Sequence, residues 1–509
     1  MKRWNTLYDY CRLPIKVITF ACLFLAIGYL IQNENVNIFY TIRNQYILLL
    51  GETCYRIGHI LIINMPLIFL LNLVSKRANS GAPTIMGIIG YVTFLIFTMM
   101  FTPHTLASTS YSPILGISYS IPTYGTIYPL QTGLVGGILV ALVTRYSYIK
   151  SRRPSVYSFL SFVDKDVAGI IYNVLFCALL GIGVALVWPI LINFIAQIIT
   201  WIANDISDPL RLSVYGILDR SLSIFGLGNI IRQPFWFGAQ GGTYANLAGE
   251  TIIGDVNIWR LMPEAQATYS GAGRFITPYY IINMFAIPAM CLGIYSVNTN
   301  VRERKKSFLL TMILIGLSFV CGNPLPMELT LLFTSPLLLI FHIILSGSLF
   351  GTLFMNNAFL GFKYSGSTVS AMPGAFPDYI INARTPQYIH SLLIILAIGI
   401  IIAIIYYFVT IIYYKYFAFD IAGSNKAKTI ANKIIAAVGG EDNIVRTYSS
   451  VFKVTIVVED LERVTYDMLK QIGASTVKET RDSIVLDFCS ASTIIRQNID
   501  NIILKSRRK

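Results

Sequence analysis

The stretch Gly322–Gly347, "GNPLPMELTLLFTSPLLLIFHIILSG", decides the fold of this chain. A glycine and two prolines open it, the acidic residue Glu328 follows, and the remainder is almost entirely apolar. A helix needs about 20 apolar residues to cross a bilayer. The opening turn lies between two apolar runs, where non-helical backbone survives only if protein buries it or if it lines a wet cavity. The stretch therefore predicts a re-entrant hairpin beside a binding cavity.

The whole chain has the composition of a membrane protein. Of its 509 residues, 55% are hydrophobic and 13% are charged, whereas soluble domains carry about 25% charged residues. This composition excludes a water-soluble globule. The clearest apolar runs are Pro14–Ile31, Ile57–Ser75, Thr84–Phe101, Thr126–Tyr146, Ala168–Ala203, Ser307–Gly322, Glu328–Phe354 and His390–Tyr414. We expect an all-α polytopic membrane domain of about ten transmembrane helices with re-entrant hairpins.

The positive charge of the chain, a net +14, is placed between the apolar runs. Basic tracts occur at Lys150–Pro154 and Arg302–Lys306, whereas Thr102–Gly125 has no charged residue. Loops rich in Lys and Arg face the cytoplasm. The distribution therefore predicts that both tracts are inside and Thr102–Gly125 is outside, and it indicates membrane orientation rather than nucleic-acid binding. The seven cysteines and four histidines show no ligand spacing, so we expect neither a metal nor a cofactor.

The C-terminal part, residues 419–509, has ordinary polarity and follows a membrane part that covers residues 1–418. Its pattern is helix, strand, strand, helix, strand, strand, helix. The first helix ends on Gly439–Gly440, a signal that terminates helices, and "FKVTIVV" (Phe452–Val458) alternates like a strand. We expect a small cytoplasmic α+β domain.

Four stretches of the chain, in this order, resemble one family of membrane proteins. They are "LDRSLSIFGLGNIIRQPFWF" (Leu218–Phe237), "SGAGRFITPYYIINMFAIPAMCLGIYSVNTNVRERKK" (Ser270–Lys306), the opening stretch Gly322–Gly347, and "GGEDNIVRTYSSVFKVTIVVED" (Gly439–Asp460). The chain resembles the glucose/N-acetylglucosamine/maltose branch of the bacterial sugar phosphotransferase system (PTS), in which a permease domain, IIC, is fused to a phosphate carrier, IIB.

This resemblance implies a mechanism and partners. The IIC domain binds a sugar between two re-entrant hairpins and a moving domain carries it across, after which IIB passes a phosphoryl group from its cysteine to the sugar. It also implies a multi-pass protein of the bacterial inner membrane, with a cytoplasmic IIB domain. The implied partners are a sugar, the lipid bilayer, a IIA protein or a separate IIB protein, and a second copy of the chain in a homodimer.

The C-terminal part departs from the family at the residue that carries phosphate. Ser450 stands at the phospho-cysteine position, while Phe452, Lys453 and Thr455 replace a threonine and two arginines. A serine hydroxyl is a much weaker nucleophile than a thiolate when no base activates it. We therefore expect Ser450 to be inactive and the domain to carry no phosphate. Cys489 is either a relocated nucleophile or, more simply, a small residue at a strand end.

The permease part keeps some of the family's polar residues and loses others. Arg220 matches a family arginine and Glu328 the second of two glutamates, whereas Leu325 replaces the first. Gly228 and Asn229 stand where the family has two histidines. A buried sugar site needs converging polar groups, and the candidate substrate-binding residues are Arg220, Asn229, Arg274, Asn323 and Glu328. The alternative for the two arginines is a snorkelling position at the lipid interface.

Two functions of different classes fit these observations. One is PTS-type transport of a hexose or glucoside, with a fused IIB-like domain that carries no phosphate. The alternative is a membrane sensor or regulatory protein that derives from such a permease and has lost the ability to transfer a phosphoryl group. The family is a sugar phosphotransferase, but Ser450 leaves that enzymatic activity open. An unrelated ion-coupled transporter is disfavoured by the IIB-like C-terminal part.

Overall fold

The computed structural model describes most of the chain. The described residues are 2–32, 44–76, 81–103, 106, 111–112, 114–121, 125–152, 164–245, 249–265, 271–299, 301–363, 371–417, 424–474, 476–488 and 491–506. The helices are α1 (Lys2–Gln32), α2 (Gln45–Ile63), α3 (Met65–Ser75), α4 (Ala82–Phe101), α5 (Gly133–Ser151), α6 (Lys165–Ala203), α7 (Pro209–Ile224), α8 (Asn229–Trp236), α9 (Asp255–Ala265), α10 (Pro278–Ile281), α11 (Ile287–Val297), α12 (Val301–Phe319), α13 (Leu325–Thr334), α14 (Pro336–Met355), α15 (Phe376–Ala383), α16 (Ile389–Ile412), α17 (Ser424–Ala437), α18 (Tyr466–Gln471) and α19 (Ser492–Ser506). The strands are β1 (Tyr119–Ile121), β2 (Gly125–Ile127), β3 (Thr243–Ala245), β4 (Thr251–Ile253), β5 (Ile444–Ser449), β6 (Lys453–Val458), β7 (Val477–Thr480) and β8 (Ser483–Asp487).

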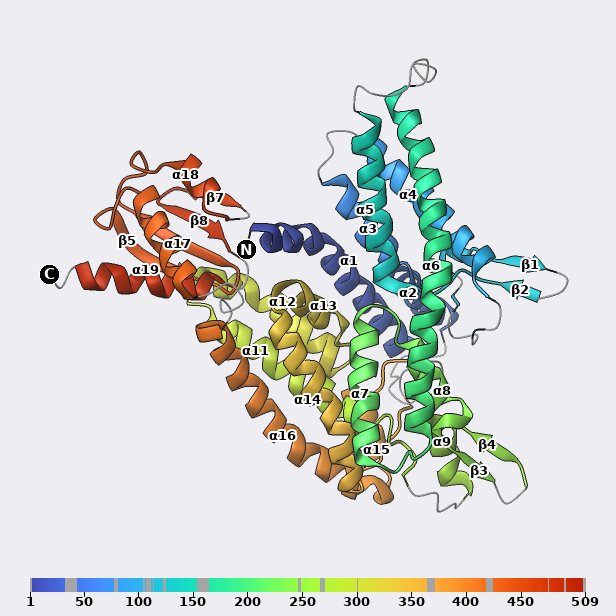
Figure 1. The fold of residues 1–509 in the computed structure, drawn as a ribbon. Helices are drawn as coiled ribbons and strands as arrows, with labels where there is room; N and C mark the ends of the chain where they lie inside the picture. The colour runs from blue at the N-terminus through green and yellow to red at the C-terminus, as the bar shows by residue number, and fades with distance from the viewer. Residues whose placement is uncertain are drawn as a thin grey trace.

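The molecule has three parts, which Figure 1 shows side by side. In the N-terminal bundle, α1–α6, helix α1 packs on α2, α3 on α5, and α4 on α6. In the second bundle, α7–α16, helix α7 packs on α14 and α11 on both α12 and α16. Helix α1 also packs against α13 and so joins the two bundles. The C-terminal module, α17–α19 with β5–β8, lies beside the ends of α11 and α16.

Seven helices in the described part of the chain are long and apolar enough to cross a membrane. They lie at Tyr10–Gln32, Gln45–Ile63, Ala82–Phe101, Lys165–Ala203, Pro278–Val297, Pro336–Met355 and Pro386–Tyr416. The chain is thus a mostly helical, multi-pass membrane protein, while the number of about ten spans stays a prediction.

Prolines divide two of the apolar runs that the sequence presents as continuous. Ile57–Ser75 breaks at Asn64, two residues before Pro66 of α3, where the Asn64 side-chain Nδ2 donates to Ile60 O at 2.9 Å and the Asn64 backbone amide donates to the same oxygen at 3.1 Å. Glu328–Phe354 breaks at Ser335, whose backbone angles are φ −147° and ψ 64°. Ser335 precedes Pro336, and a residue that precedes proline avoids helical angles. At Asn64 the break instead reflects Pro66, which has no N–H to donate to Ile62 O. Each of the two runs is therefore two helices.

The membrane part also contains strands, so the expectation that it is entirely helical is wrong in detail. Strands β1 and β2 form one antiparallel hairpin, and β3 and β4 form another. Both hairpins lie in polar segments rich in Gly, Pro and Thr between helices. The paired residues of each hairpin bond to each other through their backbone groups. This pairing replaces the hydrogen bonds that a helix would provide.

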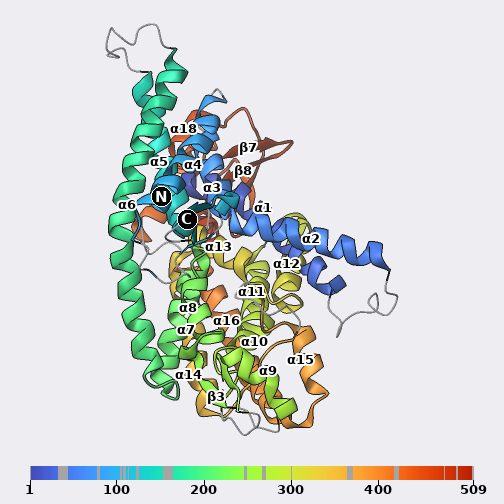
Figure 2. The ribbon, with the colours of Figure 1, turned by 90° about the vertical axis from the view of Figure 1, so that its right-hand side faces the viewer.

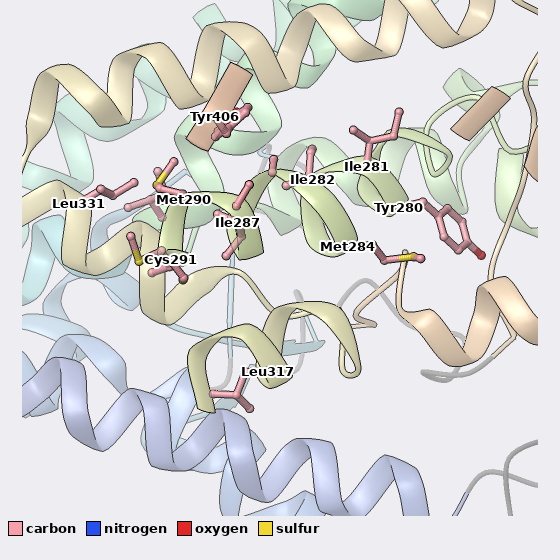
Figure 3. Packing of buried hydrophobic residues seen from close by; sticks show 14 of the residues in the cluster. Tyr280, Ile281, Ile282, Met284, Ile287, Met290, Cys291, Leu317, Leu331 and Tyr406 are labelled. Atoms are coloured by element: carbon pink, nitrogen blue, oxygen red, sulfur yellow. The ribbon is translucent and has the colours of Figure 1, made fainter. Parts of the chain in front are cut away.

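The core of the second bundle is built around the continuous helical segment Pro278–Val297. This segment joins α10 and α11 through a π-helical turn at Ile282–Ala286, and most of its side chains are buried. Figure 3 shows Ile282, Ile287 and Met290 among the neighbouring side chains of α12, α13 and α16. The segment is apolar all round because helices surround it on several sides.

Two helical hairpins of the second bundle point their turns toward its centre. The first joins α7 to α8 and turns at Gly226, where φ is 76°. The second joins α12 to α13 and turns at Gly322, where φ is 69°. Glycine adopts this left-handed conformation without steric cost. The second hairpin is the one that the stretch Gly322–Gly347 predicts, and its crossing of membrane depth stays a prediction.

The C-terminal module is a four-stranded antiparallel sheet in the order β5-β6-β8-β7. Val454, Ile456 and Val458 alternate inward and form one core with the helices of the module. The observed order of helices and strands is the one that the sequence predicts. Helix α18 begins only at Tyr466, because the preceding backbone turns to bind Ala437 O through the Thr465 amide at 2.8 Å.

The predicted membrane orientation can be tested by thiol labelling. The ends of α5 and α6 at Ser151 and Lys165 lie toward the same end of the molecule as the C-terminal module, and β3–β4 lies toward the other (Figures 1 and 2). In a variant without native cysteines, an impermeant maleimide added outside should label Tyr119→Cys and not Lys305→Cys. Both residues are exposed, whereas Ser110, nearer the centre of the uncharged stretch, lies outside the described residues. Labelling of Lys305→Cys alone would contradict the orientation.

Candidate functional site

A cavity of about 220 Å³ lies between the N-terminal bundle and the second bundle. The turns of both helical hairpins reach it, through Gly226 and Gly228 on one side and Gly322 and Asn323 on the other. Its polar and aromatic lining comes from both bundles: Tyr29, His59 and Gln131 from the first, and Arg220, Asn229, Arg232, Tyr279, Asn323 and Glu328 from the second. Since the cavity is shared, a change in the packing of the two bundles would open or close it.

Arg220 and Glu328 form a buried ion pair at the floor of this cavity. Arg220 Nη1 donates to Glu328 Oε1 at 3.2 Å, and Arg220 Nη2 donates to Asp219 Oδ2 at 2.6 Å. Both Arg220 and Glu328 are 1% exposed. Burying charges is costly unless partners and hydrogen bonds compensate them. The geometry therefore excludes the lipid-facing, snorkelling interpretation of Arg220.

Asp219 is the centre of the same network and holds a second arginine. Arg232 Nε donates to Asp219 Oδ1 at 2.6 Å, and the Tyr279 hydroxyl donates to Asp219 Oδ2 at 2.5 Å. The Tyr279 ring also faces the Arg220 guanidinium, 4.7 Å from its centroid. Asp219, Arg220, Arg232 and Glu328 thus balance each other in charge, which is the condition for keeping four ionised groups inside a protein.

His342 and Tyr406 support Glu328 from the side away from the cavity. His342 Nε2 lies 3.2 Å from Glu328 Oε1, and His342 Nδ1 lies 3.0 Å from the Tyr406 hydroxyl. In a neutral histidine one ring nitrogen donates and the other accepts. Both of these hydrogen bonds of His342 are therefore made when Nε2–H donates to the Glu328 carboxylate and Nδ1 accepts from the Tyr406 hydroxyl. Both hydrogen bonds of Glu328 to described residues use Oε1. Oε2 therefore makes no hydrogen bond to a described residue.

The turns at the cavity are held by side chains that bind backbone. Asn323 Oδ1 accepts from the Leu325 amide at 3.1 Å, which starts α13. Asn283, in the π-helical turn, donates through Nδ2 to Gly322 O at 3.1 Å and to Pro373 O at 2.8 Å. Such local irregularities in helices are frequent at functional sites. They fix the position of the second hairpin at the cavity.

Arg274 is the one predicted binding residue that the structure places elsewhere. Its Nε donates to Gly271 O at 2.7 Å and its Nη1 to Ile206 O at 2.8 Å, and it does not line the cavity. Nearby, Asp255 accepts from the amide of Gly273 at 2.8 Å. Arg274 therefore stabilises the loop before α10. Its inclusion among the cavity residues is corrected by the structure, and the sequence alone could not show this.

The structure brings four of the five predicted residues to one cavity: Arg220, Asn229, Asn323 and Glu328. The sequence interpretation did not select Arg232, Tyr279, His342 and Tyr406. Arg232 and His342 could have been selected from the sequence, because an ionisable residue inside an apolar segment is a functional candidate by default. Nothing in the sequence marks Tyr279 or Tyr406 among 31 tyrosines.

Ser450 lies far from this network in the fold, where the C-terminal module meets the second bundle. It lines a separate pocket of about 170 Å³ together with Arg12, Tyr295 and Lys453. Ser450 Oγ accepts from the Lys453 amide at 3.1 Å, and the Ser450 amide donates to Lys453 O at 2.8 Å. Its hydroxyl thus closes a tight turn. Cys489 lies outside the described residues.

Metal ligation is not part of this arrangement within the described ranges. The described residues contain no group of three or more His, Cys, Asp or Glu side chains that could hold a metal ion. The acids of the cavity network instead bind arginine and histidine side chains.

One comparison with known proteins identifies the family. The model of the family "Phosphotransferase system, EIIC" matches residues 9–347, about two thirds of the chain. The match contains both helical hairpins and every charged residue of the cavity network, and it ends inside α14, before the C-terminal module. Proteins of this family are the sugar permeases of the phosphotransferase system. The chain therefore belongs to the EIIC family of the phosphotransferase system.

Proposed function

We propose that the chain transports a neutral sugar, a hexose or glucoside, through the cavity between its two bundles. The observation that carries this proposal is the geometry at Glu328, whose Oε1 is fixed by Arg220 and His342 and whose Oε2 is left for a hydroxyl group. A charged acceptor forms stronger hydrogen bonds than a neutral one. The amide of Asn229 and the Arg232 guanidinium line the same cavity and supply donors.

The charge balance of the network favours a neutral ligand over a phosphorylated one. Its two acids and two arginines compensate each other. A sugar phosphate would therefore bring a charge that no further Lys or Arg among the described cavity-lining residues neutralises. The aromatic ring of Tyr29 also lines the cavity, where it can pack against the C–H groups of a sugar ring. The cavity is also smaller than the ~300–1,000 Å³ typical of drug-sized ligands, which supports a single sugar unit.

We propose further that the C-terminal module derives from a IIB carrier of the glucose/N-acetylglucosamine/maltose branch and no longer carries phosphate. The hydroxyl of Ser450 closes a turn, and the neighbouring side chains of Phe452 and Thr455 supply no cation. Phosphoryl transfer depends almost entirely on positioning and on electrostatic stabilisation. We also propose that the chain lies in the bacterial inner membrane as a homodimer, with its C-terminal module on the cytoplasmic side.

A binding measurement on the detergent-solubilised protein tests the proposed ligand. Titration with glucose, N-acetylglucosamine and methyl glucoside should give saturable binding for at least one of them. Glucose 6-phosphate should bind about 10-fold more weakly or not at all, because its charge is uncompensated. Tighter binding of the phosphate, or no binding of any hexose or glucoside, would overturn the proposal. Binding without uptake into vesicles would favour the sensor.

The inactivity of Ser450 gives a separate prediction. Incubation of the protein with phosphoenolpyruvate and the phosphotransfer proteins should leave the C-terminal module unlabelled, and Ser450→Ala should not change sugar uptake. Ser450→Cys alone should also remain unlabelled, since Lys453 and Thr455 do not replace two arginines that would clamp a phosphate. Mass spectrometry of the module checks each variant. Phosphate on Ser450 or on Cys489 would contradict the prediction.

A further inference from the structure

The turn Ser449–Lys453 of the C-terminal module is docked on the second bundle. The Thr299 amide, just after α11, donates to Ser449 O at 2.8 Å, and the Ser449 amide donates to Thr299 Oγ1 at 2.9 Å. Thr299 Oγ1 also donates to Ser449 O at 3.0 Å. Ser449 ends β5, which is an edge strand of the sheet. Thr299 therefore satisfies backbone groups that an edge strand otherwise leaves open.

Side chains of the same turn are buried in this contact. Val451 is 2% exposed and belongs to one hydrophobic cluster with α10, α11 and α13, and Phe452 packs against that cluster. Helix α19 also lies against the π-helical turn Tyr413–Phe417 at the end of α16. The module thus contacts the second bundle both at the chain segment that leads into it and at Thr299.

We propose that this turn is an anchor, and that the C-terminal module moves with the second bundle as one body. A phosphate carrier has to expose its reactive turn to a donor and then present it to the sugar, so the turn must leave any dock in each cycle. Here the corresponding turn is hydrogen-bonded through its backbone and buried through Val451. The surface that it covers, Tyr295–Thr299 with the start of α12, is occupied by this chain's own module.

Hydrogen exchange of the full-length protein tests the anchor without reference to transport. The Ser449 amide should be protected, and Thr299→Val should accelerate its exchange about 10-fold, because both hydrogen bonds between the Thr299 hydroxyl and Ser449 are lost while the side-chain shape is kept. Ser449→Ala is the matched control, since the Ser449 hydroxyl is buried without a partner among the described residues and its backbone makes the contact. Equal exchange in the wild type and in Thr299→Val would overturn the anchor.

Cross-linking tests whether the dock stays closed during transport, a step that rests on the proposed function. A backbone hydrogen bond of 2.8 Å joins Thr299 N to Ser449 O, so the two residues are neighbours across the contact and a disulfide between them can be tested. Thr299→Cys with Ser449→Cys, in a chain whose seven native cysteines are replaced by alanine, should oxidise fully without loss of sugar uptake. Poor cross-linking, or a loss of uptake that reductant restores, would overturn the proposal. If the reduced protein takes up no sugar, the proposed function is wrong. The cross-linking yield and the exchange rates then still test the anchor on their own.

Discussion

Replacing Glu328 with glutamine is expected to weaken sugar binding by about 10- to 150-fold while the protein stays folded. A hydrogen bond to a charged group contributes ~1.5–3 kcal/mol, which corresponds to that loss of affinity. The amide oxygen of glutamine can still accept from Arg220 or from His342, and Arg220 keeps Asp219 as its partner. The measurement is a binding titration of the detergent-solubilised variant, together with its thermal unfolding.

A matched substitution separates the cavity from general effects of lost charge. Glu52 on α2 pairs with Arg56 at 2.6 Å on an exposed surface and does not line the cavity. Glu52→Gln should bind sugar like the wild type, because Glu52 does not line the cavity. If Glu328→Gln binds as tightly as Glu52→Gln, then Glu328 is not the acceptor that we propose.

Replacing Asp219 with alanine is expected to destabilise the second bundle severely. Asp219 is fully buried and binds Arg220, Arg232 and Tyr279 at once. Removing one partner of a buried ion pair typically costs ~3–5 kcal/mol, because the remaining charge stays buried and unpaired. Since folded proteins have only about 5–15 kcal/mol of stability, the variant should aggregate or unfold at a much lower temperature in a size-exclusion and thermal-unfolding assay.

The same helix provides the control for this second prediction. Asp208 caps α7, accepts from the Leu210 amide at 2.8 Å and pairs with Arg211 at 3.4 Å. Asp208→Ala should cost only ~1 kcal/mol, the usual loss for a helix cap. Comparable unfolding temperatures for Asp219→Ala and Asp208→Ala would show that the buried network does not hold the bundle together.

The sequence predicted the class of the fold because its strongest signals are local. Long apolar runs mark helices whatever their neighbours are, and alternation marks β6 in the C-terminal module. The breaks at Asn64 and Ser335 depend on prolines inside apolar runs, where composition alone suggests continuity. The strands β1–β4 are three residues each, too short for any periodic pattern to show.

The cavity was only partly predictable, because its residues come from segments far apart in the chain. Glu328 and Arg220 stand out as ionisable residues within or beside apolar segments, and the same argument could have selected Arg232. Arg274 has the same signal, yet its guanidinium binds backbone carbonyl groups of a loop. Charge inside an apolar segment therefore identifies buried arginines, and only the three-dimensional contacts separate those at the cavity from those that hold a loop.

If the C-terminal module derives from a phosphate carrier, as we propose, the position of Ser450 explains how it can remain on a permease without carrying phosphate. Its hydroxyl closes a turn and the neighbouring Val451 is buried against the second bundle. The turn that would carry a phosphoryl group is thus used for attachment. Transport and phosphorylation are expected to be uncoupled within this chain.

Sugar uptake into proteoliposomes tests this central claim most directly. The purified chain is reconstituted alone or with phosphoenolpyruvate, the general phosphotransfer proteins and a IIA protein, and radiolabelled hexose or glucoside is added outside. We predict the same initial rate of uptake in both preparations, with the sugar recovered inside in unphosphorylated form. Uptake that requires the phosphotransfer proteins, with sugar phosphate as the product, would contradict the account.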